Sequence, residues 1–235
     1  MKIEVWSDFV CPFCYIGKKR LEEALETTGL KDKVEVTYKA YQLDPSVPED
    51  SDESMLENLA TKYRVSVDEA KNMLNNIAEQ AKTVGLTYKV DGMKVANTFK
   101  AHRLAKLAEQ EGVAEQMTEL LLNSYFVQGE AIGENDVLLS IAEKIGLKKE
   151  QVEKVLHSKE FTDAVNADIN EARQIGVQGV PFFVINRKYA ISGAQPAEVF
   201  ANALQKVAEE EGIKPHLTIL NDEASGVCTD DSCDI

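Results

Sequence analysis

Two cysteines separated by two residues, in the segment Cys11-Pro12-Phe13-Cys14, constrain this chain more than any other sequence feature. A run that alternates like a β-strand (2–7) precedes them, and a run with helical spacing (15–28) follows. We therefore expect the first thiol at a helix N-terminus, where unpaired backbone N–H groups and the helix dipole favour the thiolate. A thiolate attacks disulfides and a neighbouring thiol resolves the mixed disulfide, so this spacing indicates thiol–disulfide exchange.

The following sequence extends this junction into a β-α-β unit and then a helical block. Residues 34–40 alternate as a second strand, which we expect to pair in parallel with the first. No proline occurs between Pro48 and Pro181, and that stretch is rich in helix-forming residues. Helical spacing is found there in the segments 67–84, 98–111, 113–125, 134–145, 149–156 and 162–175. We expect these helices to form a small bundle with a core of its own.

After residue 176 the pattern returns to β-structure. The apolar run 182–185, the polar turn 186–188 and the short run 189–192 predict a hairpin. Pro196 then opens a last helix over 197–211. The order predicts an α/β chain in three parts: a discontinuous domain of residues 1–48 and 177–220, an all-helical insertion domain of residues 49–176, and an acidic tail of residues 221–235.

Composition and charge narrow the partners. The 235 residues are 44% hydrophobic, which suits a globular core, and the net charge of −14 argues against nucleic acid or an anionic membrane as a partner. The sequence has no apolar run long enough to span a membrane, and no apolar segment precedes the first strand as in a secretory signal. We therefore expect a cytoplasmic protein, in which two close cysteine pairs indicate redox chemistry or metal binding.

Longer strings around these elements carry a family resemblance. They are Trp6-Ser7-Asp8-Phe9-Val10-Cys11-Pro12-Phe13-Cys14-Tyr15-Ile16-Gly17-Lys18, Asn97-Thr98-Phe99-Lys100-Ala101-His102-Arg103-Leu104, Gly176-Val177-Gln178-Gly179-Val180-Pro181-Phe182-Phe183-Val184 and Ala190-Ile191-Ser192-Gly193-Ala194-Gln195-Pro196. Together they resemble the FrnE-type dithiol oxidoreductases of the DsbA family over about residues 1–212. The resemblance implies a thioredoxin-like fold (βαβ…ββα) with a large helical insertion.

The same resemblance implies roles for the active-site residues. Cys11 is then the nucleophile and Cys14 the resolving thiol of a disulfide oxidoreductase or isomerase. Its partners are protein or small-molecule thiols and disulfides. No cofactor is required, glutathione is a possible redox partner, and the protein is a monomer or a homodimer.

Two further positions refine this expectation. Val180-Pro181 resembles the family's cis-proline loop, which offers the Val180 backbone to a substrate chain beside Cys11. Phe13 stands where DsbA itself has histidine, and phenylalanine cannot stabilise the thiolate electrostatically. A less stable thiolate makes a weaker oxidant, so we predict a redox potential more reducing than that of DsbA, measurable by equilibrium with glutathione.

The second cysteine pair, Cys228 and Cys233, lies in the acidic tail and resembles the C-x4-C ends of some FrnE-type proteins. One hypothesis is that this pair exchanges disulfides with Cys11 and Cys14, since a tethered tail presents its thiols at millimolar effective concentration. The alternatives are an incidental pair, or a zinc site completed by donors such as Asp230 or the first pair.

Three charged or titratable residues are possible tuning groups for the thiols. Asp8 and Lys18 flank the cysteines, but solvated charges are the simpler interpretation. His102 lies on a predicted helix, where a core or surface histidine satisfied by hydrogen bonds is the default.

Other functions fit parts of the pattern. The kappa-class glutathione transferases and the glutathione-dependent chromene-carboxylate isomerases resemble this chain in the insertion and the proline loop. They typically carry serine at the position of Cys11, so the presence of both cysteines argues against them. A non-catalytic zinc-binding protein and a peptide-binding chaperone remain alternatives from a different class.

Overall fold

The computed structural model describes residues 1–214, 228–229 and 232–233. A four-stranded mixed sheet has the order β2-β1-β3-β4. Its strands are β1 (Lys2–Ser7), β2 (Glu35–Ala40), β3 (Phe182–Ile185) and β4 (Tyr189–Ser192). β1 pairs in parallel with β2 and antiparallel with β3, and β3 pairs antiparallel with β4. The predicted β-α-β unit and hairpin are therefore confirmed.

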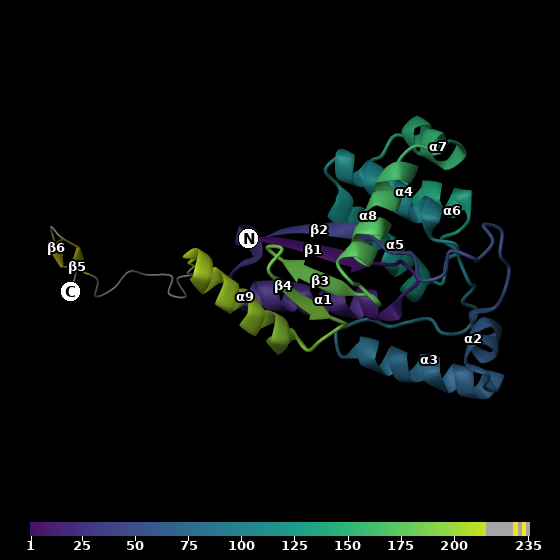
Figure 1. Cartoon of the computed structure of the whole chain (residues 1–235), viewed down its shortest axis with the longest axis horizontal. Helices are drawn as coiled ribbons and strands as arrows, with labels where there is room; N and C mark the ends of the chain where they lie inside the picture. The colour runs from purple at the N-terminus through teal and green to yellow at the C-terminus, as the bar shows by residue number, and fades with distance from the viewer. Residues whose placement is uncertain (215–227, 230–231, 234–235) are drawn as a thin grey trace.

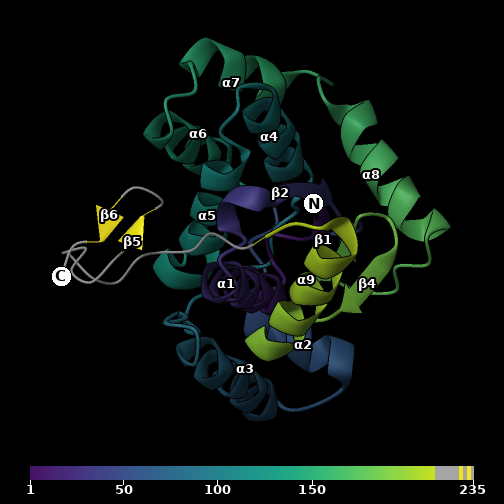
Figure 2. The same cartoon turned by 90° about the vertical axis from the view of Figure 1, so that its left-hand side faces the viewer.

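Two helices cover one face of this sheet. α1 (Pro12–Thr27) and α9 (Ala197–Glu211) lie side by side across it (Figures 1 and 2). Alternate residues of β1 point toward them, because successive side chains of a strand face opposite ways. The shared core contains Ile3, Val5, Leu21, Leu25, Phe183, Phe200 and Leu204.

The remaining helices belong to the insertion between β2 and β3. They are α2 (Met55–Tyr63), α3 (Val67–Lys82), α4 (Phe99–Gln110), α5 (Ala114–Asn123), the π-helix η2 (Ser124–Gln128), α6 (Asn135–Lys144), α7 (Lys149–His157) and α8 (Thr162–Gln174), while the 3-10 turn η1 (Lys31–Lys33) precedes β2. α2 and α3 lie apart from the group α4–α8, with the sheet layer between them (Figure 1). Every predicted helix is present to within a few residues, whereas α2 was not predicted.

The insertion contributes most of the largest apolar cluster, which is separate from the sheet core, but this cluster is not confined to the insertion. The largest apolar cluster joins residues of α3 to α7 with Phe9, Tyr15 and Ile16 of the first β-α-β unit. These three side chains are at most 4% exposed, so the helices bury the residues that flank the cysteines. The insertion therefore packs directly against the segment that carries the cysteine pair.

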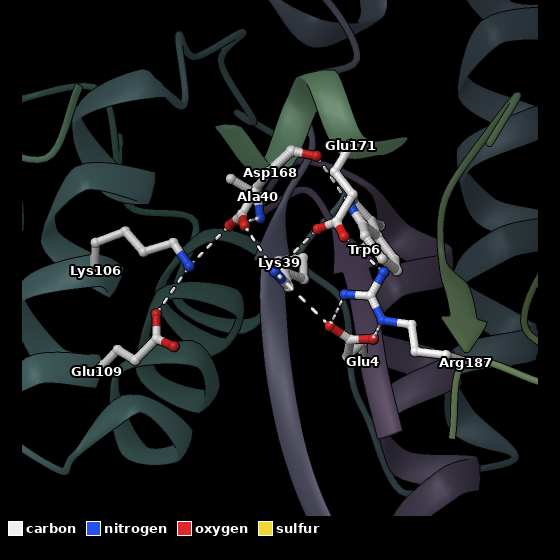
Figure 3. A network of polar contacts seen from close by, with 9 residues as sticks. All are labelled: Glu4, Trp6, Lys39, Ala40, Lys106, Glu109, Asp168, Glu171 and Arg187. Atoms are coloured by element: carbon white, nitrogen blue, oxygen red, sulfur yellow. Dashed lines mark hydrogen bonds and ion pairs between the residues drawn. The ribbon is translucent and has the colours of Figure 1, made fainter. Parts of the chain in front are cut away.

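The helix α8 is fixed to the other face of the sheet through buried polar groups (Figure 3). The indole Nε1 of Trp6 donates a hydrogen bond to the main-chain oxygen of Asp168, at 3.0 Å. The Asp168 carboxylate accepts ion pairs from Lys39 (3.2 Å) and Lys106 (2.8 Å). Strand β2, helix α4 and helix α8 thus meet at one carboxylate.

In the tail, the structure describes two two-residue strands, β5 (Cys228–Thr229) and β6 (Ser232–Cys233). They pair antiparallel, with Cys228 opposite Cys233 in the register. The side chains of this predicted second redox pair, and the rest of residues 215–235, lie outside the described part of the chain. Within the described part, no helix is long and apolar enough to cross a membrane.

Candidate active site

The cysteine pair begins helix α1. Cys11 is the N-cap residue, with extended backbone angles (φ −89°, ψ 111°), and Pro12 is the first helical residue. A proline is tolerated there because the first helical N–H groups have no partner within the helix. The backbone N–H of Cys14 donates to the carbonyl of Cys11 at 3.0 Å, which closes the turn between the two residues. Both cysteines are free thiols.

The loop before β3 places a main-chain acceptor against the first sulfur. The Val180–Pro181 peptide bond is cis, as the resemblance implied. The Cys11 thiol donates to the Val180 carbonyl, with an Sγ–O distance of 3.4 Å. The N–H of Gly193 donates to the Pro181 carbonyl at 2.8 Å, which ties the loop to the end of β4.

Gly17 allows this close approach of the loop to α1. A Cβ atom added at Gly17 would lie 3.0 Å from Cγ of Pro181 and 3.2 Å from Cζ of Phe183. Any larger residue would therefore push the proline loop away from the helix.

Both cysteine side chains are buried, with Cys11 4% exposed, but Cys14 does not line the apolar cavity that Cys11 borders. The Cys14 side chain is 2% exposed, and its sulfur accepts a hydrogen bond from the backbone N–H of Asp8 at 3.5 Å. Burial raises the pKa of Cys14 well above its ordinary value, and the hydrogen bond and charge of Cys11 raise it further. Cys14 is therefore a thiol at neutral pH and must lose its proton before it attacks a disulfide.

Asp8 and His102 form a buried pair behind the cysteines. The Asp8 carboxylate lies 3.2 Å from Nε2 of His102 and accepts a hydrogen bond from the N–H of Leu43 at 2.8 Å. Asp8 is fully buried, and His102 is 3% exposed beneath the ring of Phe9. The interpretation of His102 as a hydrogen-bonded core residue is confirmed, whereas that of Asp8 as a solvated charge is wrong.

Lys18 is also buried rather than solvated. Its side chain is 2% exposed and forms ion pairs with Glu22 and with Glu119 of α5, the latter at 2.6 Å. The Tyr15 hydroxyl donates to the same Glu119 carboxylate at 2.6 Å. Although burial acts in the opposite direction, the hydrogen bonds from Lys18 and Tyr15 lower the pKa of Glu119. These contacts join α1 to α5, so Lys18 serves packing between the two helices.

An apolar cavity of about 300 Å³ adjoins the outer side of the cysteine pair. Cys11, Pro12 and Phe13 form one wall, and residues of α2, α3 and the segment 88–98 form the others. Tyr88 in this segment donates a hydrogen bond from its hydroxyl to the Pro12 carbonyl at 2.8 Å. The segment 88–96 was not predicted to belong to the site, because it has neither helical nor strand periodicity.

Within the described residues, no group of three or more His, Cys, Asp or Glu side chains is arranged to hold a metal ion. The zinc hypothesis relied on the tail cysteines, whose side chains lie outside the described part.

Residues 2–205 match the DSBA-like thioredoxin domain family. The chain belongs to this family. The DSBA-like fold predicted from the β-α-β and β-β-α order and the helical insertion is thereby confirmed. Membership of this family supports a function in the broad class of thiol–disulfide oxidoreductases.

Three solved structures illustrate the likeness. A probable DsbA oxidoreductase from Streptomyces coelicolor is 37% identical, with a TM-score of 0.85, over 100% of this chain and 99% of that one. A 2-hydroxychromene-2-carboxylate isomerase is 16% identical, with a TM-score of 0.68, over 90% of this chain and 98% of that one. The cytosolic disulfide reductase DsbM from Pseudomonas aeruginosa, solved with GSH, is 16% identical, with a TM-score of 0.61, over 89% of this chain and 100% of that one. The last two likenesses concern the fold alone.

Proposed function

We propose that this DSBA-like protein is a dithiol–disulfide oxidoreductase in which Cys11 is the nucleophile and Cys14 the resolving thiol. The observation that carries the proposal is the difference between the two sulfurs. Both side chains are buried, but Cys11 is the N-cap residue of α1, faces the Val180 carbonyl at 3.4 Å and lines the cavity, whereas Cys14 does not line the cavity and has a raised pKa. A substrate therefore meets Cys11 first.

The reaction proceeds in two exchanges. The Cys11 thiolate attacks one sulfur of a substrate disulfide, forms a mixed disulfide and releases the other substrate sulfur as a thiolate, which takes up a proton. Cys14 then loses its proton and attacks the Cys11 sulfur, which releases the second substrate thiol and leaves a Cys11–Cys14 disulfide. Two electrons pass from the protein dithiol to the substrate, and a thiol reductant must restore the dithiol. The exchange uses only these sulfurs, so it needs no cofactor.

We assign glutathione as a candidate for that reductant, supported by DsbM, the structural neighbour that was solved with GSH. That neighbour is a cytosolic reductase, which fits our expectation of a cytoplasmic protein working toward reduction. Membership of the FrnE-type subgroup, isomerase activity and a disulfide shuttle between the tail pair Cys228/Cys233 and the first pair are the finer parts of this proposal. Phe13 supports a redox potential more reducing than that of DsbA.

Insulin reduction with glutathione or dithiothreitol tests the proposal. We expect activity in the wild type, no activity in Cys11→Ser, and a trapped mixed disulfide at Cys11 in Cys14→Ser, seen by mass spectrometry. No insulin reduction by the wild type, together with a glutathione-dependent transfer or isomerisation that survives in Cys11→Ser, would instead support a glutathione-dependent transferase or isomerase. Suppression of aggregation that survives replacement of both cysteines would support a chaperone.

Deletion of residues 221–235 tests the tail. A shuttle predicts that the Cys14→Ser variant of the full chain forms an internal disulfide between Cys11 and Cys228 or Cys233. An unchanged redox potential after the deletion, together with no such adduct, would contradict the shuttle.

A further inference from the structure

Strand β2 forms one edge of the main sheet, and its outer side carries unpaired main-chain groups. The N–H groups of Glu35, at its start, and Tyr41, just after its end, point toward β1. Alternate residues point the other way, and the N–H of Ala40 does so to reach a carboxylate on α8. Val36 and Tyr38 therefore direct their N–H and C=O groups outward, where no described residue forms a hydrogen bond with them. Such an edge is a template for another strand.

Free space adjoins this edge from both sides. A groove of about 870 Å³ lies between β2 and the helices α1, α5 and α6, and its apolar lining includes Val36, Tyr38, Leu21 and Leu25. A smaller cavity of about 180 Å³ reaches the same Val36 and Tyr38 from the side of α4. The unpaired groups of β2 are therefore accessible to a segment of chain.

The charged groups of the larger groove favour an uncharged occupant. Lys18 and Lys19 both form ion pairs with Glu119, and Lys31 pairs with Glu26 at 2.8 Å. A charged ligand would have to compete with these pairs, whereas apolar side chains can cover the apolar lining without disturbing them.

The chain contains a segment of matching chemistry directly after α9. Residues 216–220 lie outside the described part of the chain. In their sequence, Leu217 and Ile219 alternate with His216 and Thr218, and the segment contains no Asp, Glu, Lys or Arg. Alternation with apolar and β-branched residues is typical of a strand that covers an apolar surface on one face.

The end of α9 brings this segment to the start of β2. Glu211 lies 3.9 Å from the N-terminal amino group, which in turn donates to the Lys33 carbonyl at 3.2 Å (Figure 1). A strand outside β2 would lie about 10 Å from β1, because neighbouring strands are about 4.8 Å apart. The residues 212–215 can span about 13 Å, so the segment 216–220 can reach this edge.

The topology of the sheet fixes the direction of such a strand. β4 runs parallel to β1 and β2, because β3 is antiparallel to both β1 and β4. A strand that follows α9 and starts beside the start of β2 would run parallel to all three. Its connection through α9 would cross the face that α1 covers, in the same direction as the connection from β1 to β2 (Figure 2). The two crossovers then share one hand, as the strong preference for right-handed crossovers requires.

We propose that the segment 216–220 forms a fifth strand of the main sheet, parallel to β2 and on its free edge. Leu217 then lies beside Val36 and Ile219 beside Tyr38, so that both apolar side chains enter the groove over α1. Between them, Thr218 donates its N–H to the Val36 carbonyl and accepts a hydrogen bond from the N–H of Tyr38.

Two features of the sequence and fold agree with this register. Pro215 has no N–H to donate, and it would stand just before the first bonded residue, a position that edge strands tolerate. The strand would also lead the tail, residues 221–235, toward the end of the sheet where α1 begins. The proposal goes beyond the proposed function and does not depend on it.

Amide hydrogen exchange of the full-length protein, followed by NMR, tests the pairing. Thr218→Pro removes the N–H that would bond to Val36, whereas the control Ala224→Pro changes the chain outside the segment. We expect the amides of Val36 and Tyr38 to exchange about tenfold or more faster in Thr218→Pro than in the wild type, and at an unchanged rate in Ala224→Pro. Equal rates in all three proteins would overturn the proposal.

Two aspartate variants test the register. Ile219 would face the groove over α1, whereas Leu220 would face the opposite side of the sheet, as Lys39 does. We expect Ile219→Asp to lower Tm by about 4 °C or more, and Leu220→Asp to change it by no more than about 1 °C. The same loss in both variants would refute this register.

Cross-strand NOEs decide which chain supplies the strand. NOEs between residues 217–219 and 36–38 within one chain are the expected result. If a mixture of labelled and unlabelled protein shows these NOEs only between chains, the assignment to the chain's own segment is overturned and the strand is exchanged between two copies. Absence of these NOEs would overturn the fifth strand itself. None of these measurements depends on the redox activity of Cys11, so the proposed function is tested separately.

Discussion

The buried carboxylate of Asp168 has three partners, and its removal should weaken the fold (Figure 3). It pairs with Lys39 at 3.2 Å and Lys106 at 2.8 Å, and it accepts a hydrogen bond from the buried N–H of Ala40 at 3.0 Å. The side chain of Asp168 is 6% exposed. Two variants, Asp168→Ala and Asp168→Asn, separate the loss of all contacts from the loss of charge.

The magnitude follows from these contacts. Removal of one partner from a buried ion pair costs about 3–5 kcal/mol, and a buried N–H without an acceptor costs about 1–3 kcal/mol. The side chains of Lys39 and Lys106 are 18% and 12% exposed, so both ammonium groups can regain some water. We therefore expect Asp168→Ala to cost about 3 kcal/mol of unfolding free energy, which lowers Tm by about 6–12 °C in a chain of this length. Asp168→Asn keeps an acceptor for Ala40 and should cost about 2 kcal/mol.

The assay uses the single tryptophan of the chain. Trp6 is fully buried and hydrogen-bonded to the main chain at Asp168, so its fluorescence reports unfolding and undocking of α8. Glu109→Ala is the matched control, because Glu109 pairs with the same Lys106 at 2.8 Å but is 43% exposed. Surface pairs contribute about 0–1 kcal/mol, so the control should change little. If both alanine variants lose the same stability in urea, the reasoning about burial is refuted.

Three further predictions follow from single features of the structure. Because burial raises the pKa of Cys14, the rate of its attack on the mixed disulfide should increase about tenfold per pH unit from pH 6 to 8.5. A rate, measured by stopped flow, that does not change with pH would contradict this. Gly17→Ala, whose Cβ would lie 3.0 Å from Pro181, should lower insulin reduction several-fold while stability changes by no more than about 2 kcal/mol; unchanged activity would argue against a role of the loop. Arg103→Met removes a buried guanidinium that donates to main-chain carbonyls within 155–160, and calorimetry should show a loss of about 3 kcal/mol; a loss below about 1 kcal/mol would be inconsistent with these bonds.

The raised pKa of Cys14 also makes the stability of the fold depend on pH. A thiol whose pKa is raised by folding favours the native state while it is protonated, which holds below its unfolded pKa of about 8.5. This contribution is lost as the pH rises above that value, so alkaline destabilisation should be smaller in Cys14→Ser.

Most of the fold could be predicted because its signals are local. Alternation in β1, the proline at the start of α1 and the helical spacing of the segments from α3 to α8 each depend on residues a few positions apart. Helix α2 was not predicted because it is only nine residues long, although Met55, Leu59 and Tyr63 share one of its faces at helical spacing. This face lines the cavity beside Cys11.

The candidate site could be predicted only in part. The cysteine pair and the proline loop are contiguous motifs, and they stand where the resemblance placed them. Lys18 was misjudged because a lysine beside an active site is usually solvated, and its acceptor Glu119 lies about a hundred residues later on another helix. Thr98, which borders the cavity, has a buried hydroxyl with no hydrogen-bond partner among the described residues, and no sequence signal predicts this because only the surrounding packing decides it.

The contacts of the cysteine segment also explain why the domain division read from sequence says little about the site. The Tyr88 hydroxyl holds the Pro12 carbonyl at 2.8 Å, and His102 holds the Asp8 carboxylate at 3.2 Å. Both donors come from the predicted insertion 49–176. Without it, the first turn of α1 would lose a hydrogen bond, the buried carboxylate would lose its partner, and the cavity would lose most of its walls. Periodicity tells which face of an element is buried, but not which distant segment covers it. The insertion is therefore part of the candidate active site, and the cysteine motif alone does not define its walls.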